Sequence, residues 1–203
     1  MESNYIHMPG YRVNEYQLVL APHEELRNKI RSAREVFFNR YKITGSKNHS
    51  VNLSLLKFYN REMMEEKIVH RMQVLAMGQT PFKVEINNFG SFPTHSLIIK
   101  VDTKLPIQNL TSQLKPYGRL LKMNNELKPV FFDEPYFLLA GRLKPWQYEE
   151  GWLEYSHKHF KGRFIADSML LLKRPYGERS AFQIVKRFDF QDLPVVTKQA
   201  SLF

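Results

Sequence analysis

Histidine side chains are the first candidates for chemistry in this sequence, which contains seven of them. Histidine exchanges protons near neutral pH and also ligates metals. His49 lies three positions before Asn52, so in a strand the two side chains point to opposite faces, and no hydroxyl stands two residues after His49. His95 is expected at a strand end. His157 and His159 alternate without a third ligand nearby, which favours a solvated helix end over a metal site.

The sequence has no cysteine, which excludes disulfides, thiolate zinc sites and cysteine nucleophiles. This composition fits a reducing compartment. The apolar runs 18–22 and 169–172 are far shorter than the about 20 residues that a spanning helix needs, and Glu2 lies where a signal peptide carries positive charge. We therefore predict a soluble, cytoplasmic protein.

Thirty lysines and arginines oppose twenty aspartates and glutamates, and the net charge of +10 is spread evenly over both halves of the chain. Long-range attraction favours an anionic partner such as RNA or a nucleotide, although the same charge also serves solubility. Lys173, Arg174 and Arg179 flank a predicted turn at 175–177, where they could contact phosphates or form a solvated basic turn. The few glycines form no phosphate-binding loop pattern.

The apolar spacing predicts the elements that position these side chains. In the first half, we expect strands over 16–21, 51–58 and 82–89. One helix has Pro22 in its first turn, and a second is capped by Asn60 and ends at Gly78. The buried stripes of these helices are Leu26, Ile30, Ala33 and Phe37, and Met64, Ile68, Met72 and Leu75.

The second half repeats this order of elements. Strands are expected over 97–101 and 135–140, with a helix over 107–114 that Pro116 ends and another that Pro145 opens. Two long strands follow, over 163–173 and 181–190. The face that the last strand buries is predicted to carry Phe182, Ile184, Phe188 and Phe190.

This repetition predicts an α+β fold with two pseudo-symmetric lobes of mostly antiparallel sheet and outer helices around a central cleft. Residues 1–14 have no periodicity and form an irregular lead-in. Residues 15–192 are expected to form a single bilobal domain, with lobe one over about 15–90 and lobe two over about 91–192. Residues 193–203 are interpreted as a tail.

Five stretches of this sequence are similar to segments of a known protein family: YQLVLAP, FYNREMMEEKIVHRM, FGSFPTHSLIIKV, KPWQYEEGWLEYSHKHFKGRFIADSMLLLKRP and RFDF. Together they resemble the 2H phosphoesterase superfamily, and specifically its bacterial 2′-5′ RNA ligase-like members, over roughly residues 15–192. In that family, two His-x-Thr/Ser motifs lie on facing strands, one in each lobe. One imidazole takes a proton from the attacking oxygen and the other donates one to the leaving oxygen, while the hydroxyls hold the phosphate. The resemblance implies no metal and no other cofactor.

Both motifs are altered in this chain. Counted back from Phe58, the first motif falls on 52–54, where Asn52 replaces the histidine and Ser54 keeps the hydroxyl. Asparagine cannot titrate, so this half of the proton-transfer pair is lost.

The second motif falls on 136–138, where Tyr136 replaces the histidine and Leu138 replaces the hydroxyl. Tyrosine, with a pKa near about 10, is a poor acid or base at neutral pH. Family members also tend to place arginine where Gly141 stands, although Arg142 is adjacent. No intact catalytic residue remains at the motif positions.

The resemblance therefore implies a homologue that has lost catalysis and binds an RNA end or a nucleotide phosphate in its cleft, through Ser54, Asn52, Tyr136 and Arg142. Two alternatives stay open: an active phosphodiesterase or RNA ligase with relocated acid and base groups, and a structural or interaction protein with a vestigial cleft. A basic, open cleft would favour binding, and a cleft filled by apolar side chains would favour the interaction protein. We expect a monomer with no metal and no membrane partner.

Overall fold

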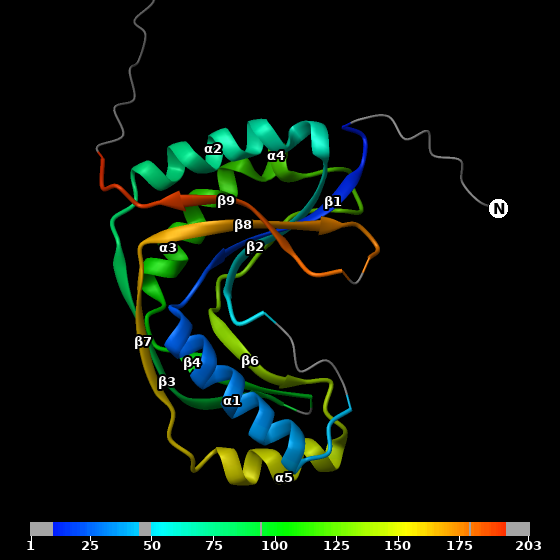
Figure 1. The fold of residues 1–203 in the computed structure, drawn as a ribbon, viewed down its shortest axis with the longest axis vertical. Helices are drawn as coiled ribbons and strands as arrows, with labels where there is room; N and C mark the ends of the chain where they lie inside the picture. Colours follow the sequence, from blue (N-terminus) through cyan, green and yellow to red (C-terminus); the bar gives the residue numbers. More distant parts are fainter. Residues whose placement is uncertain (1–9, 45–49, 94, 179, 194–203) are drawn as a thin grey trace, which may run out of the picture.

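Two antiparallel sheets organise the chain in the computed structural model, which describes residues 10–44, 50–93, 95–178 and 180–193 (Figure 1). Sheet A has the strand order β5-β2-β1-β8-β9, and sheet B has the order β6-β4-β3-β7. The predicted tail from 194 onward and the lead-in up to residue 9 lie outside the described residues. The strands are β1 (Val13–Leu20), β2 (Leu53–Arg61), β3 (Phe82–Phe92), β4 (Ser96–Val101), β5 (Val130–Phe131), β6 (Tyr136–Gly141), β7 (Lys161–Ala166), β8 (Ser168–Pro175) and β9 (Gln183–Asp189).

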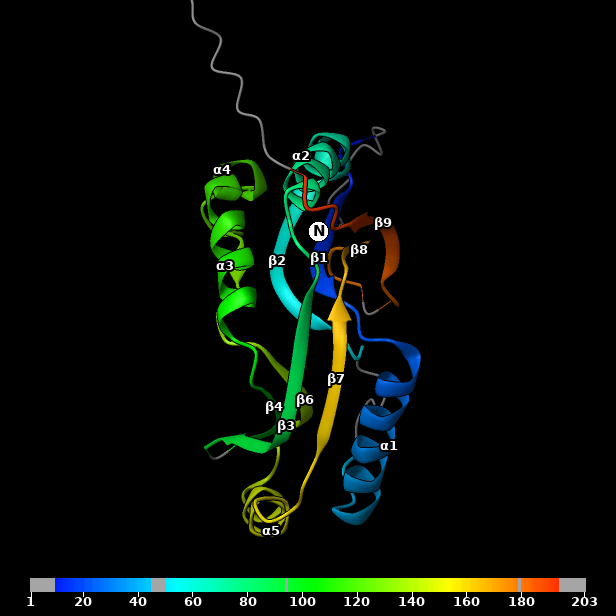
Figure 2. The same cartoon turned by 90° about the vertical axis from the view of Figure 1, so that its left-hand side faces the viewer.

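Each sheet is covered on one face by helices. Helices α1 (Glu24–Arg40) and α5 (Pro145–Tyr155) contact sheet B, whereas α2 (Glu65–Met77), α3 (Leu105–Leu114) and α4 (Gly118–Leu121) contact sheet A. Figure 2 shows α1 and α3 on opposite sides of the molecule. Because α1 follows a strand of sheet A but packs on sheet B, the two halves of the chain are joined through their helices. The predicted α+β architecture with two antiparallel sheets is confirmed.

Local signals explain most helix ends. The imidazole of His23 caps α1 by accepting a hydrogen bond from the Leu26 amide at 3.2 Å, so α1 begins one residue after His23 and Pro22 lies outside it. The predicted cap at Asn60 is wrong. Asn60 belongs to β2, and a 3-10 turn (Glu62–Met64) leads into α2. The Asn60 side chain does not cap the helix because it donates to the Leu120 carbonyl oxygen at 3.1 Å.

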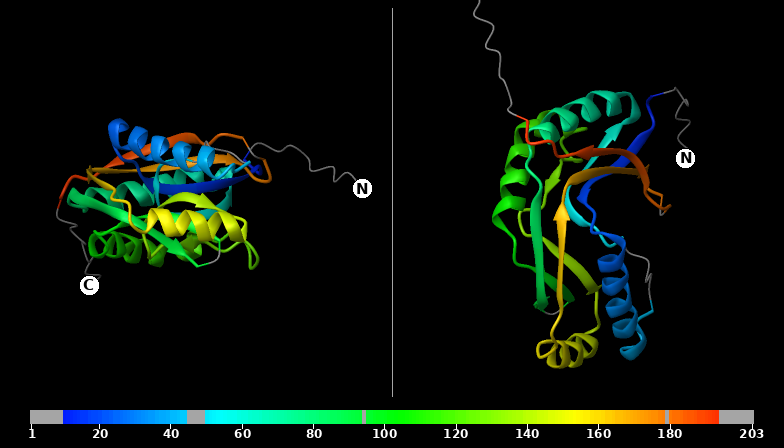
Figure 3. Two further views of the ribbon diagram at one scale, coloured as in Figure 1. Left: turned by 90° about the horizontal axis from the view of Figure 1, so that it is seen from below. Right: turned by 60° about the vertical axis from the view of Figure 1, so that its left-hand side comes forward.

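The last strands differ from the prediction in two ways. The expected strand over 163–173 is broken at Asp167 into β7 of sheet B and β8 of sheet A, so one extended segment links the two sheets. The right-hand view of Figure 3 shows this segment running from the α5 end toward sheet A. In β9, Leu171 pairs with Lys186 and Leu172 with Ile184, so a bulge changes the face. Ile184 is therefore 66% exposed, although Phe188 is fully buried.

One continuous hydrophobic core lies between the sheets and their helices. Its aromatic centre on sheet B joins α1 to α5: the ring centroid of Phe37 lies 4.6 Å from that of Tyr41 and 4.9 Å from that of Tyr155. Such edge-on and tilted ring pairs are favourable beyond the area that they bury. Among the described residues, no helix is long and apolar enough to cross a membrane.

Candidate ligand-binding site

Strand β2 carries a β-bulge directly after Ser54. Ser54 pairs with Val19 of β1, whereas the next pair joins Leu56 to Leu18, so Leu55 is an extra residue in the ladder. Bulges are common beside functional sites because they redirect the side chains around them. The bulge therefore marks the point where the first altered motif ends.

Strand β6 carries a bulge at the corresponding place. Leu138 pairs with Ile98 of β4, whereas the next pair joins Ala140 to Leu97, so Leu139 is the extra residue. In both strands the bulged leucine follows the third position of the motif. The β1·β2 and β4·β6 pairs are thus built alike, which makes Asn52 equivalent to Tyr136, and Ser54 equivalent to Leu138.

The two motif strands also begin near each other. The Phe132 amide donates to the carbonyl oxygen of Leu55 at 3.0 Å. Tyr136 follows four residues later, and four residues span at most about 14 Å. Asn52, Ser54, Tyr136 and Leu138 are all half-buried.

The sheet B side of this site is apolar and aromatic. The ring centroids of Phe92 and Tyr136 lie 5.0 Å apart and nearly perpendicular, and Phe92 also stacks on His95 at 6.3 Å. Phe92 and Tyr136 pair with Ser96 and Lys100, which lie about 13 Å apart along β4. Because the two rings nevertheless meet, they lie together over β4, which separates their strands.

The sheet A side is polar, with its charges largely compensated. The buried carboxylate of Glu15 lies 2.9 Å from the Lys57 ammonium and 2.7 Å from the Arg174 guanidinium. Burial alone would raise the pKa of Glu15, but hydrogen bonds and charge attraction from Lys57 and Arg174 outweigh it and lower the pKa. Glu15 and Val19 alternate on one strand face, so this cluster shares the face of Ser54.

Gly141 and Arg142 follow β6. A Cβ at Gly141 would lie 3.5 Å from both Leu138 Cδ2 and Ser96 Oγ, so position 141 faces the site. Arg142 has a left-handed backbone with φ of 55°, is exposed, and lies about 13 Å along the chain from Leu138. It is therefore at the rim rather than at the motif itself.

Arg34 is a site residue that the sequence analysis missed. It is 2% exposed on α1, and its Nη2 donates to the carbonyl oxygen of Leu138 at 2.7 Å. This contact holds the backbone of β6 at the altered motif position. Its spacing four residues after Ile30, within the buried stripe of α1, is the signal that could have revealed it.

Among the described histidines, His95 and His159 are held by loop contacts. His49, like Arg179, lies outside the described residues. His95 lies in the β3–β4 turn with its Nδ1 2.9 Å from the Pro93 carbonyl oxygen, and His159 Nδ1 lies 3.3 Å from Asn88 Oδ1. Within the described ranges, no cluster of three or more His, Asp or Glu side chains could hold a metal ion.

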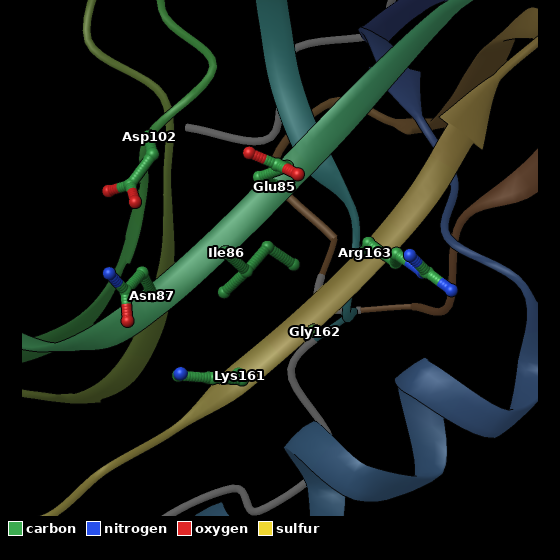
Figure 4. Close-up of a pocket in the computed structure, with 7 residues that line it drawn as sticks. All are labelled: Glu85, Ile86, Asn87, Asp102, Lys161, Gly162 and Arg163. Atoms are coloured by element: carbon green, nitrogen blue, oxygen red, sulfur yellow. The ribbon is translucent and has the colours of Figure 1, made fainter.

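A separate pocket of about 480 Å³ opens on β3 and β7 (Figure 4). The lining residues drawn in Figure 4 include two carboxylates, Glu85 and Asp102, and two cations, Lys161 and Arg163. A hydrogen bond from Lys83 lowers the pKa of Glu85, which keeps this carboxyl charged. The two carboxylates offset the two cations, so the lining offers no net positive charge to a nucleotide phosphate.

Comparison with solved structures identifies the same fold in other proteins. TT0787 of Thermus thermophilus is 14% identical with a TM-score of 0.61, covering 87% of this chain and 98% of that chain. A protein described as a phosphoesterase is 13% identical with a TM-score of 0.59, covering 89% and 98%. LigT of E. coli complexed with 3′-AMP is 9% identical with a TM-score of 0.57, covering 88% and 98%. No protein-family model and no curated protein matches the sequence.

Proposed function

We propose that this chain, which has the fold of the 2H phosphoesterases, is a 2′-5′ RNA ligase-like homologue that binds an RNA end or a nucleotide phosphate without hydrolysing it. The observation that carries this proposal is the pair of equivalent bulges after Ser54 and Leu138. The bulges mark two corresponding positions, and these hold Asn52 and Tyr136 instead of imidazoles. Each lost acid or base costs about 10²–10⁴ in rate.

The polar side chains at the start of β2 suit the phosphate. The Ser54 hydroxyl and the Asn52 amide can each donate a hydrogen bond to a phosphate oxygen. Hydrogen bonds to a charged acceptor contribute about 1.5–3 kcal/mol. Lys57 is already engaged by Glu15, so the proposal does not assign it to the ligand.

The aromatic side of the site suits the base. Tyr136 and Phe92 offer ring faces and edges on which a nucleobase can stack, at about 1–3 kcal/mol per base. Arg142 at the rim suits a neighbouring phosphate of a longer RNA rather than the terminal phosphate. The 3′-AMP in the LigT complex makes this nucleotide a suitable probe.

Calorimetric titration with 3′-AMP tests the binding. We expect Ser54→Ala to weaken binding about tenfold, because it removes one hydrogen bond to the phosphate. Ser112→Ala, which alters an exposed serine of α3, should leave the affinity unchanged. Arg142→Ala should weaken binding of a short RNA with a 3′-terminal phosphate while leaving 3′-AMP unaffected.

Hydrolysis assays with 2′,3′-cyclic nucleotides test the loss of catalysis. We expect no turnover near pH 7. Turnover that survives Ser54→Ala would contradict the assignment of the site and favour relocated acid and base groups. Absence of 3′-AMP binding would contradict the binding function and favour an interaction protein.

A further inference from the structure

We propose a second nucleic-acid site: the groove between α2 and the α4 region binds the backbone of single-stranded RNA. The groove has a volume of about 740 Å³ and lies between the first turns of α2 and the segment that contains α4. Figure 2 shows α2 and α4 beside each other at one end of the molecule. This site goes beyond the proposed function, because it uses neither altered motif.

The groove is strongly basic. Among the described residues, no acidic side chain lines it, whereas five cationic ones do: Arg61, Lys67, Arg71, Arg119 and Lys122. Within the described part of the chain, none of the five forms a salt bridge with a carboxylate. Lys122 donates to Asn125 Oδ1 and Arg61 lies over the Tyr11 ring, and both contacts leave the positive charge uncompensated.

The carboxylates of the same segment are directed elsewhere. Glu65 accepts hydrogen bonds from Lys173 at 2.8 Å and from the Tyr16 hydroxyl at 3.0 Å, and Glu62 lies 3.4 Å from the Lys173 ammonium. Lys173 and Tyr16 belong to sheet A. Glu62 and Glu65 are therefore directed to sheet A, and the exposed Glu66 is not among the residues that line the groove.

The groove also has apolar surface between its cations. Met63 is 57% exposed, and Met64, Tyr117 and Met123 are half-buried along the lining. Aromatic side chains between cations are typical of single-strand sites, where bases stack while phosphates meet the charges, and Tyr117 supplies such a ring here. The five cations together with the Tyr117 ring fit single-stranded RNA, whose phosphates and bases would use both.

A tertiary hydrogen bond holds the two walls together. The Asn60 side-chain amide donates to the Leu120 carbonyl oxygen at 3.1 Å and so ties the end of β2 to α4. The groove is therefore present before any ligand binds. Arg61 lies seven residues, or about 23 Å, along β2 from Ser54, so one mononucleotide cannot occupy both sites.

Fluorescence anisotropy with an RNA of about twelve nucleotides tests the groove. The probe carries hydroxyl groups at both ends, so it lacks the terminal phosphate that the cleft is proposed to bind. We expect Lys67→Gln/Arg71→Gln/Arg119→Gln to weaken binding at least tenfold at about 50 mM salt. The slope of log Kd against log salt should fall by about 2, since each phosphate contact on a single strand contributes about 0.7.

A charge-matched control separates a site from diffuse attraction. Arg31→Gln/Lys104→Gln/Lys186→Gln removes three exposed cations from other elements and should change the affinity less than about twofold. Both triple variants should keep the wild-type unfolding midpoint. Equal losses in the two variants, or no wild-type binding at low salt, would overturn the proposal.

A competition experiment tests whether the partner is RNA or an acidic protein. A polyglutamate peptide of the same net charge should compete with the labelled RNA at least tenfold more weakly than unlabelled RNA does. Equal competition would overturn the assignment to RNA and make the groove a site for acidic proteins. Loss of 3′-AMP binding alone would not change RNA binding in the groove, because 3′-AMP and the RNA probe different sites.

Discussion

At the scale of single residues, the proposed site combines a hydroxyl on one strand with an apolar side chain at the corresponding position of the other. Ser54 keeps the group that would contact a phosphate oxygen, whereas Leu138 puts a branched apolar side chain at the equivalent position of β6. Arg34 holds the Leu138 carbonyl oxygen from α1, so the backbone of the altered motif remains anchored. The backbone of β6 at Leu138 is therefore fixed by a buried cation of α1.

Restoring the three altered residues tests this interpretation. Asn52→His/Tyr136→His/Leu138→Thr should gain measurable hydrolysis of a 2′,3′-cyclic nucleotide, because each general acid or base contributes about 10²–10⁴ in rate. Initial rates by chromatography provide the measurement. The matched control, Asn52→Gln/Tyr136→Gln/Leu138→Thr, should stay inactive because glutamine cannot transfer protons. Equal rates in the two triple variants would contradict the proposed roles.

At the scale of elements, sheet A is organised around a buried carboxylate. Glu15 of β1 joins Lys57 of β2 to Arg174 of β8, and the two cations are 31% and 26% exposed at their side chains. Three neighbouring strands are thus linked by charge as well as by their backbone ladder. Without the carboxylate, two cations would face each other on one sheet surface.

Glu15→Gln should lower the free energy of unfolding by about 2 kcal/mol at pH 7, since one partner of a largely buried ion cluster is lost. The folded pKa of Glu15 lies below its unfolded value, so its contribution is present above about pH 4.5 and is lost as the pH falls through the folded pKa. Urea unfolding of both proteins at pH 7 and below pH 4 measures the contribution of Glu15 to the free energy of unfolding. The difference between wild type and variant should shrink at the lower pH.

Glu178→Gln is the control for a surface pair. Glu178 lies 3.6 Å from Arg12 and both side chains are more than half exposed, so the loss should stay below about 0.5 kcal/mol. A Glu15→Gln effect of the same size at both pH values would show that shape rather than charge is responsible.

At the scale of the whole molecule, the two halves are joined where α1 meets α5. Gly151 lies in the middle of α5, where glycine costs about 1 kcal/mol relative to alanine. A Cβ there would lie 2.9 Å from Phe37 Cζ, and Phe37 is held by Tyr41 and Tyr155. The Tyr41 hydroxyl also donates to Glu154 Oε2 at 2.6 Å; burial and this bond raise the pKa of Tyr41 to about 12, which keeps the donor protonated.

Gly151→Ala should destabilise the protein by about 1–2 kcal/mol despite the better helix propensity, because overpacking against a fixed ring costs about 1–3 kcal/mol. Gly118→Ala is the matched control. Its Cβ would meet only Phe131 Cζ at 4.0 Å, so stability should stay equal or rise. Chemical denaturation of the two variants measures both effects, and equal stabilities would contradict the close approach of α1 and α5.

Short-range features of the sequence predicted most of the elements and the α+β class, because apolar spacing within a segment decides which face it can bury. Positions 52–54 and 136–138, proposed from the sequence as the motif positions, lie at the starts of β2 and β6, and a bulge follows each of them. The predicted helix cap at Asn60 was wrong because the carbonyl oxygen of Leu120, distant in sequence, binds its side chain instead. The predicted buried face of β9 was wrong because the bulge in this strand arises only when it pairs with β8.

Only the tertiary structure decided what surrounds the motifs. Arg34 and Leu138 are 104 positions apart, and Arg174 and Glu15 are 159 apart, so no local pattern announces either contact. The Phe92–Tyr136 contact depends on the pairing of β3 and β6 with β4, and the basic groove depends on α2 and α4 meeting across the end of β2. Sequence periodicity specifies which side of each element is apolar. Which polar groups meet is decided when the folded core brings distant segments together.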